Sequence, residues 1–125
     1  MAKLNPQPRN YEQADAALKL RRTNSLAIGH NTRMERYTRN RDSIDIWLHN
    51  TAIITYNLDS SIEINSGGYR TSTTKDRINQ LLPDGCYVYQ QDWTWYLVLN
   101  GDHGRPVKFR DNMRITHSEE GWTMA

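Results

Sequence analysis

The residues most able to do chemistry form one segment near the middle of the chain, where a glycine pair precedes hydroxyl and basic side chains. Gly67 and Gly68 allow the backbone to turn sharply, so that successive N–H groups can point to one side. Thr73 or Thr74 can cap the helix that follows, and Asp76 stands three residues after Thr73, as in a capping box. Because the first N–H groups of a helix have no partner within it, this pattern predicts a site for an anion such as phosphate.

The basic and hydroxyl side chains of this segment supply the other donors that an anion site needs. Guanidinium and ammonium groups add positive charge, and threonine hydroxyls add neutral donors. The predicted ligand-binding residues of the segment are Gly67, Gly68, Arg70, Thr71, Thr73, Thr74, Lys75 and Arg77. The competing interpretation is structural: the glycines form a turn, the threonines cap a helix and the cations point into solvent. The spacing of glycine and lysine differs from that of a P-loop.

A second set of candidates is the tripeptide His-x-Thr, which occurs at residues 30–32 and again at residues 49–51. Paired His-x-Thr motifs are typical of a class of phosphoesterases in which one histidine is the base, the other the acid, and the threonines hold phosphate oxygens. The catalytic candidates are therefore His30 and His49. Those enzymes place the motifs in two similar lobes far apart in the sequence, whereas 19 positions separate these. The pattern favours a binding protein over an enzyme and leaves enzymatic activity undecided.

Aromatic side chains gather in a short stretch of the C-terminal half. The stretch contains Tyr87, Tyr89, Trp93, Trp95 and Tyr96. On an exposed sheet face they could stack on nucleic-acid bases, and in the interior they would supply the bulk that a polar chain needs to fold. The mean hydropathy of −0.85 makes the second role the more common expectation.

Metal ligands and cofactor motifs are not evident in the sequence. The four histidines lack a paired ligand spacing, and Cys86 is the single cysteine. We therefore expect no metal, no cofactor and no intramolecular disulfide, which suits a reducing compartment. No apolar run approaches the roughly 18 residues of a membrane span, and the first ten residues lack the apolar core of a signal peptide. We expect a cytoplasmic protein without a membrane partner.

The net charge of +2 conceals an uneven distribution. Residues 1–41 carry nine lysines and arginines against three carboxylates, a balance of +6, and residues 42–125 carry −4. A basic lobe can attract a polyanion, although it can equally be a solvated surface.

The periodicity of apolar residues predicts a single small α+β domain with an antiparallel sheet. The domain is expected over residues 11–116, with loose tails at 1–10 and 117–125. Helices are predicted at 11–22 and 73–82, and strands at 32–38, 61–65, 86–90, 94–99, 107–109 and 113–116. Residues 43–57 contain one even-numbered apolar series, which favours a single bent strand over a tight hairpin. Residues 23–31 are expected to form a connector, with a turn at 39–42.

The central part of the chain resembles a family of small bacteriophage-encoded proteins. The resemblance is carried by the Leu-His-x-Thr strand at residues 48–51 and by the sequence Ser-Gly-Gly-Tyr-Arg-Thr-Ser-Thr-Thr-Lys-Asp-Arg-Ile-Asn at residues 66–79, and it is close over about residues 24–90. It implies a phage source and a location in the host cytoplasm. It also implies that His49 and Thr51 belong with the glycine segment, as two halves of one polar site.

Three hypotheses follow for the function. The first is a module that binds nucleic acid or a nucleotide through the glycine segment, together with His49 and Thr51. The second is an interaction or inhibitor protein that acts on a host protein. The third is a phosphodiesterase that uses His30 and His49. The sequence leaves open whether the chain forms a homo-oligomer.

Overall fold

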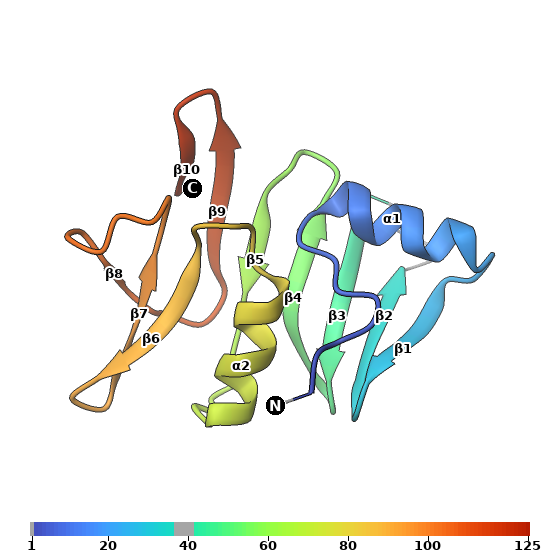
Figure 1. The fold of residues 1–125 in the computed structure, drawn as a ribbon, viewed down its shortest axis with the longest axis horizontal. Helices are drawn as coiled ribbons and strands as arrows, with labels where there is room; N and C mark the ends of the chain where they lie inside the picture. The colour runs from blue at the N-terminus through green and yellow to red at the C-terminus, as the bar shows by residue number, and fades with distance from the viewer. Residues whose placement is uncertain (1, 37–41) are drawn as a thin grey trace.

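The computed structural model describes residues 2–36 and 42–125, which contain two helices and ten strands (Figure 1). In chain order the elements are α1 Tyr11–Leu20, β1 Ser25–Gly29, β2 Thr32–Arg36, β3 Ser43–Leu48, β4 Thr51–Asn57, β5 Ile62–Ile64, α2 Ser72–Leu81, β6 Tyr87–Gln91, β7 Thr94–Val98, β8 Val107–Lys108, β9 Met113–Ser118 and β10 Gly121–Met124. The expected α+β class is confirmed.

The strands form two antiparallel sheets of unequal size. The larger has the order β1-β2-β3-β4-β5-β9-β10, and the smaller has the order β6-β7-β8. Figure 1 shows α1 and α2 over the same face of the larger sheet, α1 against β3 and β4, and α2 beside β4. Short turns join β1 to β2 and β3 to β4, whereas β5 pairs with β9 across an insertion that contains α2 and the whole smaller sheet.

The core lies between the larger sheet and the two helices. Its β-branched residues suit a strand with one buried face. Strand register aligns their side chains in rows across the sheet, and one row consists of Ile44, Tyr56, Ile62 and Ile115. The next row consists of Ile46, Ile54, Ile64 and Met113. From the helices, Ala14, Leu18, Ile78 and Leu81 are buried in the same core.

The prediction of one bent strand over residues 43–57 was wrong. The structure has a hairpin, because His49 adopts a left-handed φ of 53° and Leu48 pairs directly with Thr51. The pairing then shifts, since Ile46 faces Ile54 and Trp47 faces Ala52, which leaves Ile53 as an extra residue on β4. That bulge puts Ile54 and Tyr56 on the same face as Ile44 and Ile46, so the even-numbered apolar series resumes beyond the turn as it would in one strand.

Other boundaries also differ from the predictions. The predicted connector at residues 23–31 contains β1, and the predicted C-terminal tail contains the end of β9 and all of β10. Most of the turn expected at 39–42, and the end of the strand expected at 32–38, lie outside the described residues.

The segment before α1, predicted to be loose, packs against the rest of the chain. Leu4 is buried, and its N–H donates to the Gln80 side chain at 2.7 Å. The N–H of Asn5 donates to the carbonyl of Ile28 on β1 at 2.8 Å. In Figure 1 this segment crosses in front of the larger sheet between the two helices.

At the other end of the larger sheet, a side chain covers part of β10. The Asn100 amide oxygen accepts from the N–H of Trp122 at 2.8 Å, and its NH₂ group donates to the carbonyl of Trp122 at 2.7 Å. One asparagine therefore satisfies both main-chain groups of a residue on the last strand.

Candidate functional site

A cavity of about 630 Å³ opens between the β3–β4 turn and the loop that leads into α2. We call it the motif pocket, because both sequence motifs contribute to it. The described residues that line it are Leu48, His49, Asn50, Thr51, Ile53, Ser66, Tyr69, Thr71, Thr73 and Thr74. Its wall combines hydroxyl, imidazole and amide groups with an apolar side formed by Leu48 and Ile53.

The glycine loop closes directly onto the strand motif. Gly67 has a φ of +62°, and a Cβ at this position would lie 2.7 Å from both Cγ2 and Oγ1 of Thr51. The loop is held by its own hydrogen bonds, in which the Ser66 hydroxyl accepts from the Gly68 N–H at 3.2 Å and the Ser66 carbonyl accepts from the Tyr69 N–H at 3.0 Å. Glycine is therefore needed at position 67 to bring the loop against Thr51.

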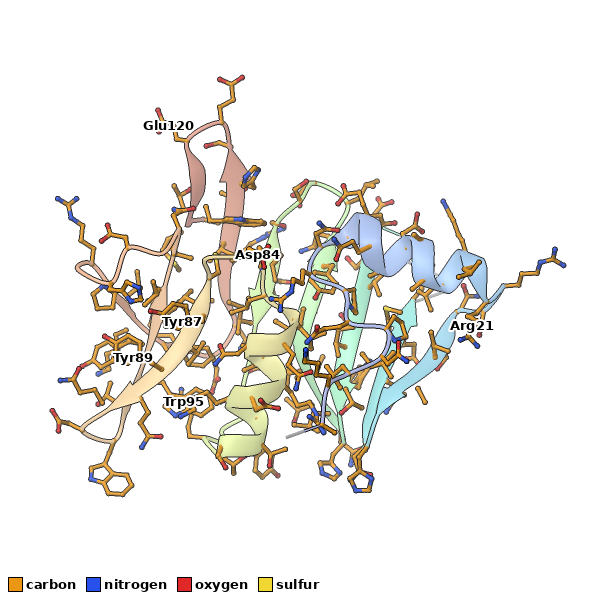
Figure 2. All side chains as sticks on the ribbon, viewed as in Figure 1. Arg21, Asp84, Tyr87, Tyr89, Trp95 and Glu120 are labelled. Atoms are coloured by element: carbon orange, nitrogen blue, oxygen red, sulfur yellow. The ribbon has the colours of Figure 1, made fainter. Side chains whose placement is uncertain are left out.

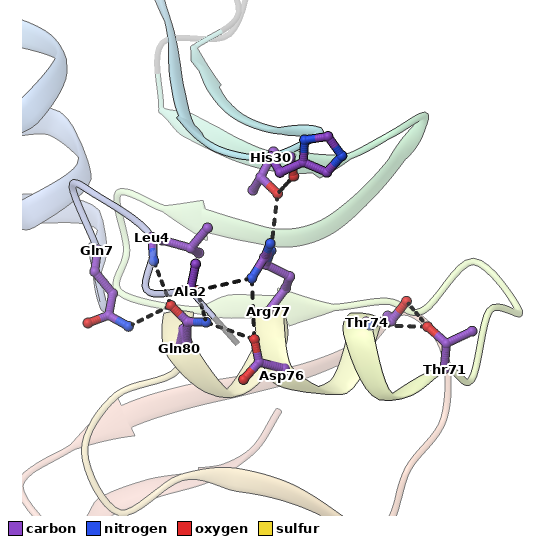
Figure 3. Close-up of polar contacts among 10 residues, drawn as sticks. Ala2, Leu4, Gln7, His30, Thr71, Thr74, Asp76, Arg77 and Gln80 are labelled. Atoms are coloured by element: carbon purple, nitrogen blue, oxygen red, sulfur yellow. Dashed lines mark hydrogen bonds and ion pairs between the residues drawn. The ribbon is translucent and has the colours of Figure 1, made fainter.

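The start of α2 forms another side of the pocket. Thr71 is the N-cap, with its hydroxyl accepting from the Thr74 N–H at 3.2 Å and lying 3.0 Å from the Thr74 hydroxyl (Figure 3). The cap predicted at Thr73 or Thr74 was therefore placed too late, and so was the capping box. Asp76 instead accepts from Gln80 and Arg77. Thr73 is left exposed in the first turn of the helix.

The two His-x-Thr motifs lie at neighbouring turns. The N–H of His49 donates to the carbonyl of Asn31 at 2.8 Å, which ties the β3–β4 turn to the β1–β2 turn that contains His30. His49 lines the motif pocket and His30 is not among the described residues that line it. Thr32 is 3% exposed, and its hydroxyl donates to the His30 carbonyl at 2.8 Å and accepts from Arg77 at 3.3 Å. A phosphodiesterase would need that hydroxyl for a phosphate oxygen.

Arg70 points toward the smaller sheet and is not among the described residues that line the pocket, although it contacts Ser66, which is. Its Nε donates to the Ser66 hydroxyl at 2.9 Å, and its guanidinium lies 3.6 Å from the Asp111 carboxylate. The guanidinium carbon also lies 5.3 Å from the ring centre of Trp95 and 4.8 Å from that of Phe109. Arg70 therefore joins the glycine loop to the smaller sheet.

Arg77 is buried, on the side of α2 that faces away from solvent. Its side chain donates to the Thr32 hydroxyl. It also donates to the carbonyl of Ala2 at 3.4 Å and to Asp76 at 3.3 Å, as Figure 3 shows. Lys75 is partly exposed in the first turns of α2 and is not among the described residues that line the pocket. The three cations predicted for the anion site therefore lie outside the pocket lining.

The predicted ligand-binding residues thus divide into three groups. His49, Thr51, Thr71, Thr73 and Thr74 line the pocket. Gly67 and Gly68 shape its loop through their positive φ angles. Arg70, Lys75 and Arg77 lie elsewhere. The lining residues that sequence reasoning missed are Leu48, Asn50, Ile53, Ser66 and Tyr69. Four of these five stand within the two family motifs, so extending each motif to all its residues would have found them.

Asp111 is a charged residue that contacts the start of the glycine loop. Burial alone would raise the pKa of this carboxyl group, but the hydrogen bonds from Ser66 and the charge of Arg70 hold the pKa below its ordinary value. The carboxylate accepts from the Ser66 N–H at 2.8 Å and from the Ser66 hydroxyl at 2.6 Å. Asp111 is therefore ionised at neutral pH and anchors the residue from which the glycine loop begins.

Some cations of the basic lobe pair with carboxylates of the same lobe. Arg36 is buried and pairs with Asp15, and Lys19 pairs with the same carboxylate at 2.9 Å. Arg33 lies 3.7 Å from Glu35. Arg39 and Arg41 lie outside the described residues. The balance of +6 already counts both of these carboxylates, Asp15 and Glu35, so the pairs leave the net positive charge of the lobe unchanged.

The described residues contain no group of three side chains able to hold a metal ion. Within the same residues, neither helix has the length and apolar character that a membrane-spanning segment requires.

Comparison with known proteins gives a family for the chain. No curated protein and no solved structure matches it. The family model described as Kyanoviridae Gp96 protein matches residues 10–116, a range that contains the whole motif pocket. The expected resemblance to a bacteriophage family is confirmed. The chain belongs to the Kyanoviridae Gp96 protein family, a family of phage proteins.

Proposed function

We propose that this phage protein binds a phosphate-bearing ligand, a nucleotide or a nucleotide unit of a nucleic acid, in the motif pocket and in the cytoplasm of the host. The observation that supports the proposal is that residues from two separate sequence motifs line one cavity. His49 and Thr51 come from one motif and Thr71, Thr73 and Thr74 from another, yet all five line the same cavity. A volume of about 630 Å³ is within the range of small-molecule sites.

The pocket offers separate surfaces for the two parts of a nucleotide. The first turn of α2, with Thr73 exposed beside it, supplies N–H and hydroxyl donors for a phosphate. Leu48 and Ile53 supply an apolar wall against which a base or sugar can pack. The Tyr69 ring, which is 65% exposed, stands at the same cavity and can stack on a base.

The charge of the pocket predicts how binding should depend on salt. None of the described lining residues is lysine or arginine. Neutral donors and the His49 imidazole would therefore hold the phosphate, and few counterions would be released. Affinity should fall only weakly as salt concentration rises.

The test is calorimetric titration with nucleoside mono- and triphosphates, the matching nucleosides and inorganic phosphate. Thr51→Val and Thr73→Val remove one hydroxyl each at nearly constant volume, and each should weaken nucleotide binding about tenfold, since a hydrogen bond to a charged group contributes about 1.5–3 kcal/mol. Thr123→Val makes the same change at an exposed position on β10 and should bind as wild type does.

Two outcomes would overturn the proposal: no binding of any phosphate compound at low salt, or binding that Thr51→Val and Thr73→Val leave unchanged. A host protein would then become the favoured partner. Trp93, which is 91% exposed at the β6–β7 turn, is the kind of large aromatic residue that protein interfaces use.

A further inference from the structure

The smaller sheet has one buried face and one face that carries tyrosines. Val88, Trp95, Leu97 and Phe109 are buried on the inner face. On the outer face Tyr89 pairs with Tyr96, and Tyr96 pairs with Lys108 across the next strand. Because paired residues project from the same side of a sheet, these three side chains share a face, and Tyr87 joins them two residues before Tyr89.

The tyrosine rings form a continuous row. Tyr89 and Tyr96 are stacked, with ring centres 5.5 Å apart and planes inclined by 25°. Tyr87 lies 6.4 Å from Tyr89, and the His103 ring lies 5.5 Å from Tyr87 and hydrogen-bonds to its hydroxyl. All three tyrosines are half-buried, so part of each ring remains accessible. In Figure 2, Tyr89 and Trp95 lie on opposite sides of the smaller sheet, with Trp95 toward α2.

Positive charge lies on the segment that contains β8, where Lys108 pairs with Tyr96. Arg105, Lys108 and Arg110 are exposed on the segment that contains β8, and none of them is within ion-pair distance of a carboxylate in the described part of the chain. The nearby carboxylates in the sequence are Asp102, which accepts from the Gly104 N–H, Asp92 in the β6–β7 turn, and Asp111, which is bound by Ser66 and Arg70. Residues 105–110, which include the edge strand β8, therefore contain three cations and no acid.

We propose that this surface, Tyr87, Tyr89 and Tyr96 with Arg105, Lys108 and Arg110, binds single-stranded nucleic acid. Aromatic rings in a row match the faces of successive unpaired bases, and cations beside them match the phosphates of the same strand. A duplex keeps its base faces stacked on each other and cannot offer them to tyrosines. The surface is distinct from the motif pocket, since none of its residues is among those that line the pocket.

The test is fluorescence anisotropy with labelled oligo-dT, oligo-U and a duplex of the same length. Both single strands should bind more tightly than the duplex. Tyr89→Leu and Tyr96→Leu should each weaken strand binding about tenfold, because a stacked base contributes about 1–3 kcal/mol. Tyr89→Phe and Tyr96→Phe keep the ring and should retain most of the affinity.

A pair of lysine variants tests the role of charge. Lys108→Ala should weaken strand binding and lower the slope of log affinity against log salt by about one. Lys3→Ala removes an exposed lysine far from this sheet in the sequence and should leave both quantities unchanged. Equal effects of the two variants would show non-specific attraction and overturn the proposal.

Other outcomes would also overturn it: no strand binding by the wild type, binding that the leucine variants leave unchanged, or equal affinity for duplex. Sedimentation of the same variants tests a second copy as the occupant, and a wild-type dimer that becomes monomeric in the leucine variants would assign the surface to self-association. Nucleotide binding in the motif pocket is tested separately, by titration with mononucleotides. Either proposal can therefore fail without the other.

Discussion

Arg70 has contacts that combine ion pairing, hydrogen bonding and stacking in one side chain. Its guanidinium lies between the Ser66 hydroxyl and Asp111 on one side and the rings of Trp95 and Phe109 on the other. A residue predicted from the sequence to bind a ligand therefore has a clear structural use, because its contacts connect a loop to a second sheet.

The expected outcome for Arg70→Ala is a loss of about 2 kcal/mol in the free energy of unfolding, from the charged hydrogen bond and the two ring contacts. Urea denaturation measures it. Lys75→Ala, on the same helix-and-loop segment but partly exposed, should change that free energy by less than about 0.5 kcal/mol. If Arg70→Ala is as stable as wild type and nucleotide affinity falls instead, the original ligand-binding interpretation of Arg70 is restored.

At the scale of elements, the glycine loop and β4 meet at one close contact. A Cβ at Gly67 would lie 2.7 Å from Thr51, whereas a Cβ at Gly68 would meet nothing within 4 Å, although both residues have positive φ. Substitution of the two glycines in turn therefore separates two free-energy costs, that of the backbone conformation and that of a steric clash with Thr51.

Gly68→Ala should cost only the backbone term, about 1 kcal/mol, while Gly67→Ala adds a steric clash and should cost about 2–3 kcal/mol and weaken nucleotide binding. Thermal denaturation and the nucleotide titration measure the two effects. Combining Gly67→Ala with Thr51→Ala should recover part of the stability, since the colliding atoms are removed. Equal destabilisation by the two glycine variants would show that the contact with Thr51 does not matter.

Sequence patterns predicted individual elements better than their junctions. Both helices were found because their apolar residues repeat at helical spacing. The β3–β4 hairpin was missed because the bulge at Ile53 hides the change of strand in the apolar pattern. The α2 cap was predicted at the wrong residue because Ser72, Thr73 and Thr74 are all residue types that cap helices well. Which residue becomes the N-cap depends on the path of the glycine loop after its contact with Thr51, and that path selects Thr71.

At the scale of the whole molecule, the two sheets are connected through Asp111. The carboxylate binds Ser66, at the end of the β5 segment, and Arg70, which stacks on residues of the smaller sheet and its neighbouring segment. The pairing of β5 with β9 across that whole insertion could not be predicted from the sequence, because local periodicity carries no information on partners so far apart. The motif pocket was partly predictable, because the family resemblance grouped its two halves.

Acid should weaken the fold through this connection. Burial alone would raise the pKa of Asp111, but the Ser66 hydrogen bonds and the Arg70 charge lower it overall. A lowered folded-state pKa gives stability that is complete above the unfolded value of about 3.9 and is lost as the pH falls through the folded value. The free energy of unfolding should therefore be steady near neutrality and decline below about pH 4.

Urea denaturation at several pH values tests this. Asp111→Asn should have a free energy of unfolding about 1 kcal/mol below that of wild type at neutral pH. On acidification, that free energy should fall less than it does in wild type. Burial alone would raise the pKa of Asp15, but the hydrogen bonds and charges of Lys19 and Arg36 lower it overall, so part of the acid response should survive in the variant. If Asp111→Asn loses as much stability in acid as wild type does, groups other than Asp111 cause the acid sensitivity of the fold.

The outer strands of the larger sheet have a consequence for how the protein behaves at high concentration. An open strand edge is a template on which further strands can add, and growth of that kind ends in fibres. Here the Asn5 N–H covers the Ile28 carbonyl on β1, and the Asn100 amide covers both main-chain groups of Trp122 on β10. These contacts occupy main-chain groups at both ends of the larger sheet, so a further strand cannot add through Ile28 or Trp122 without displacing them.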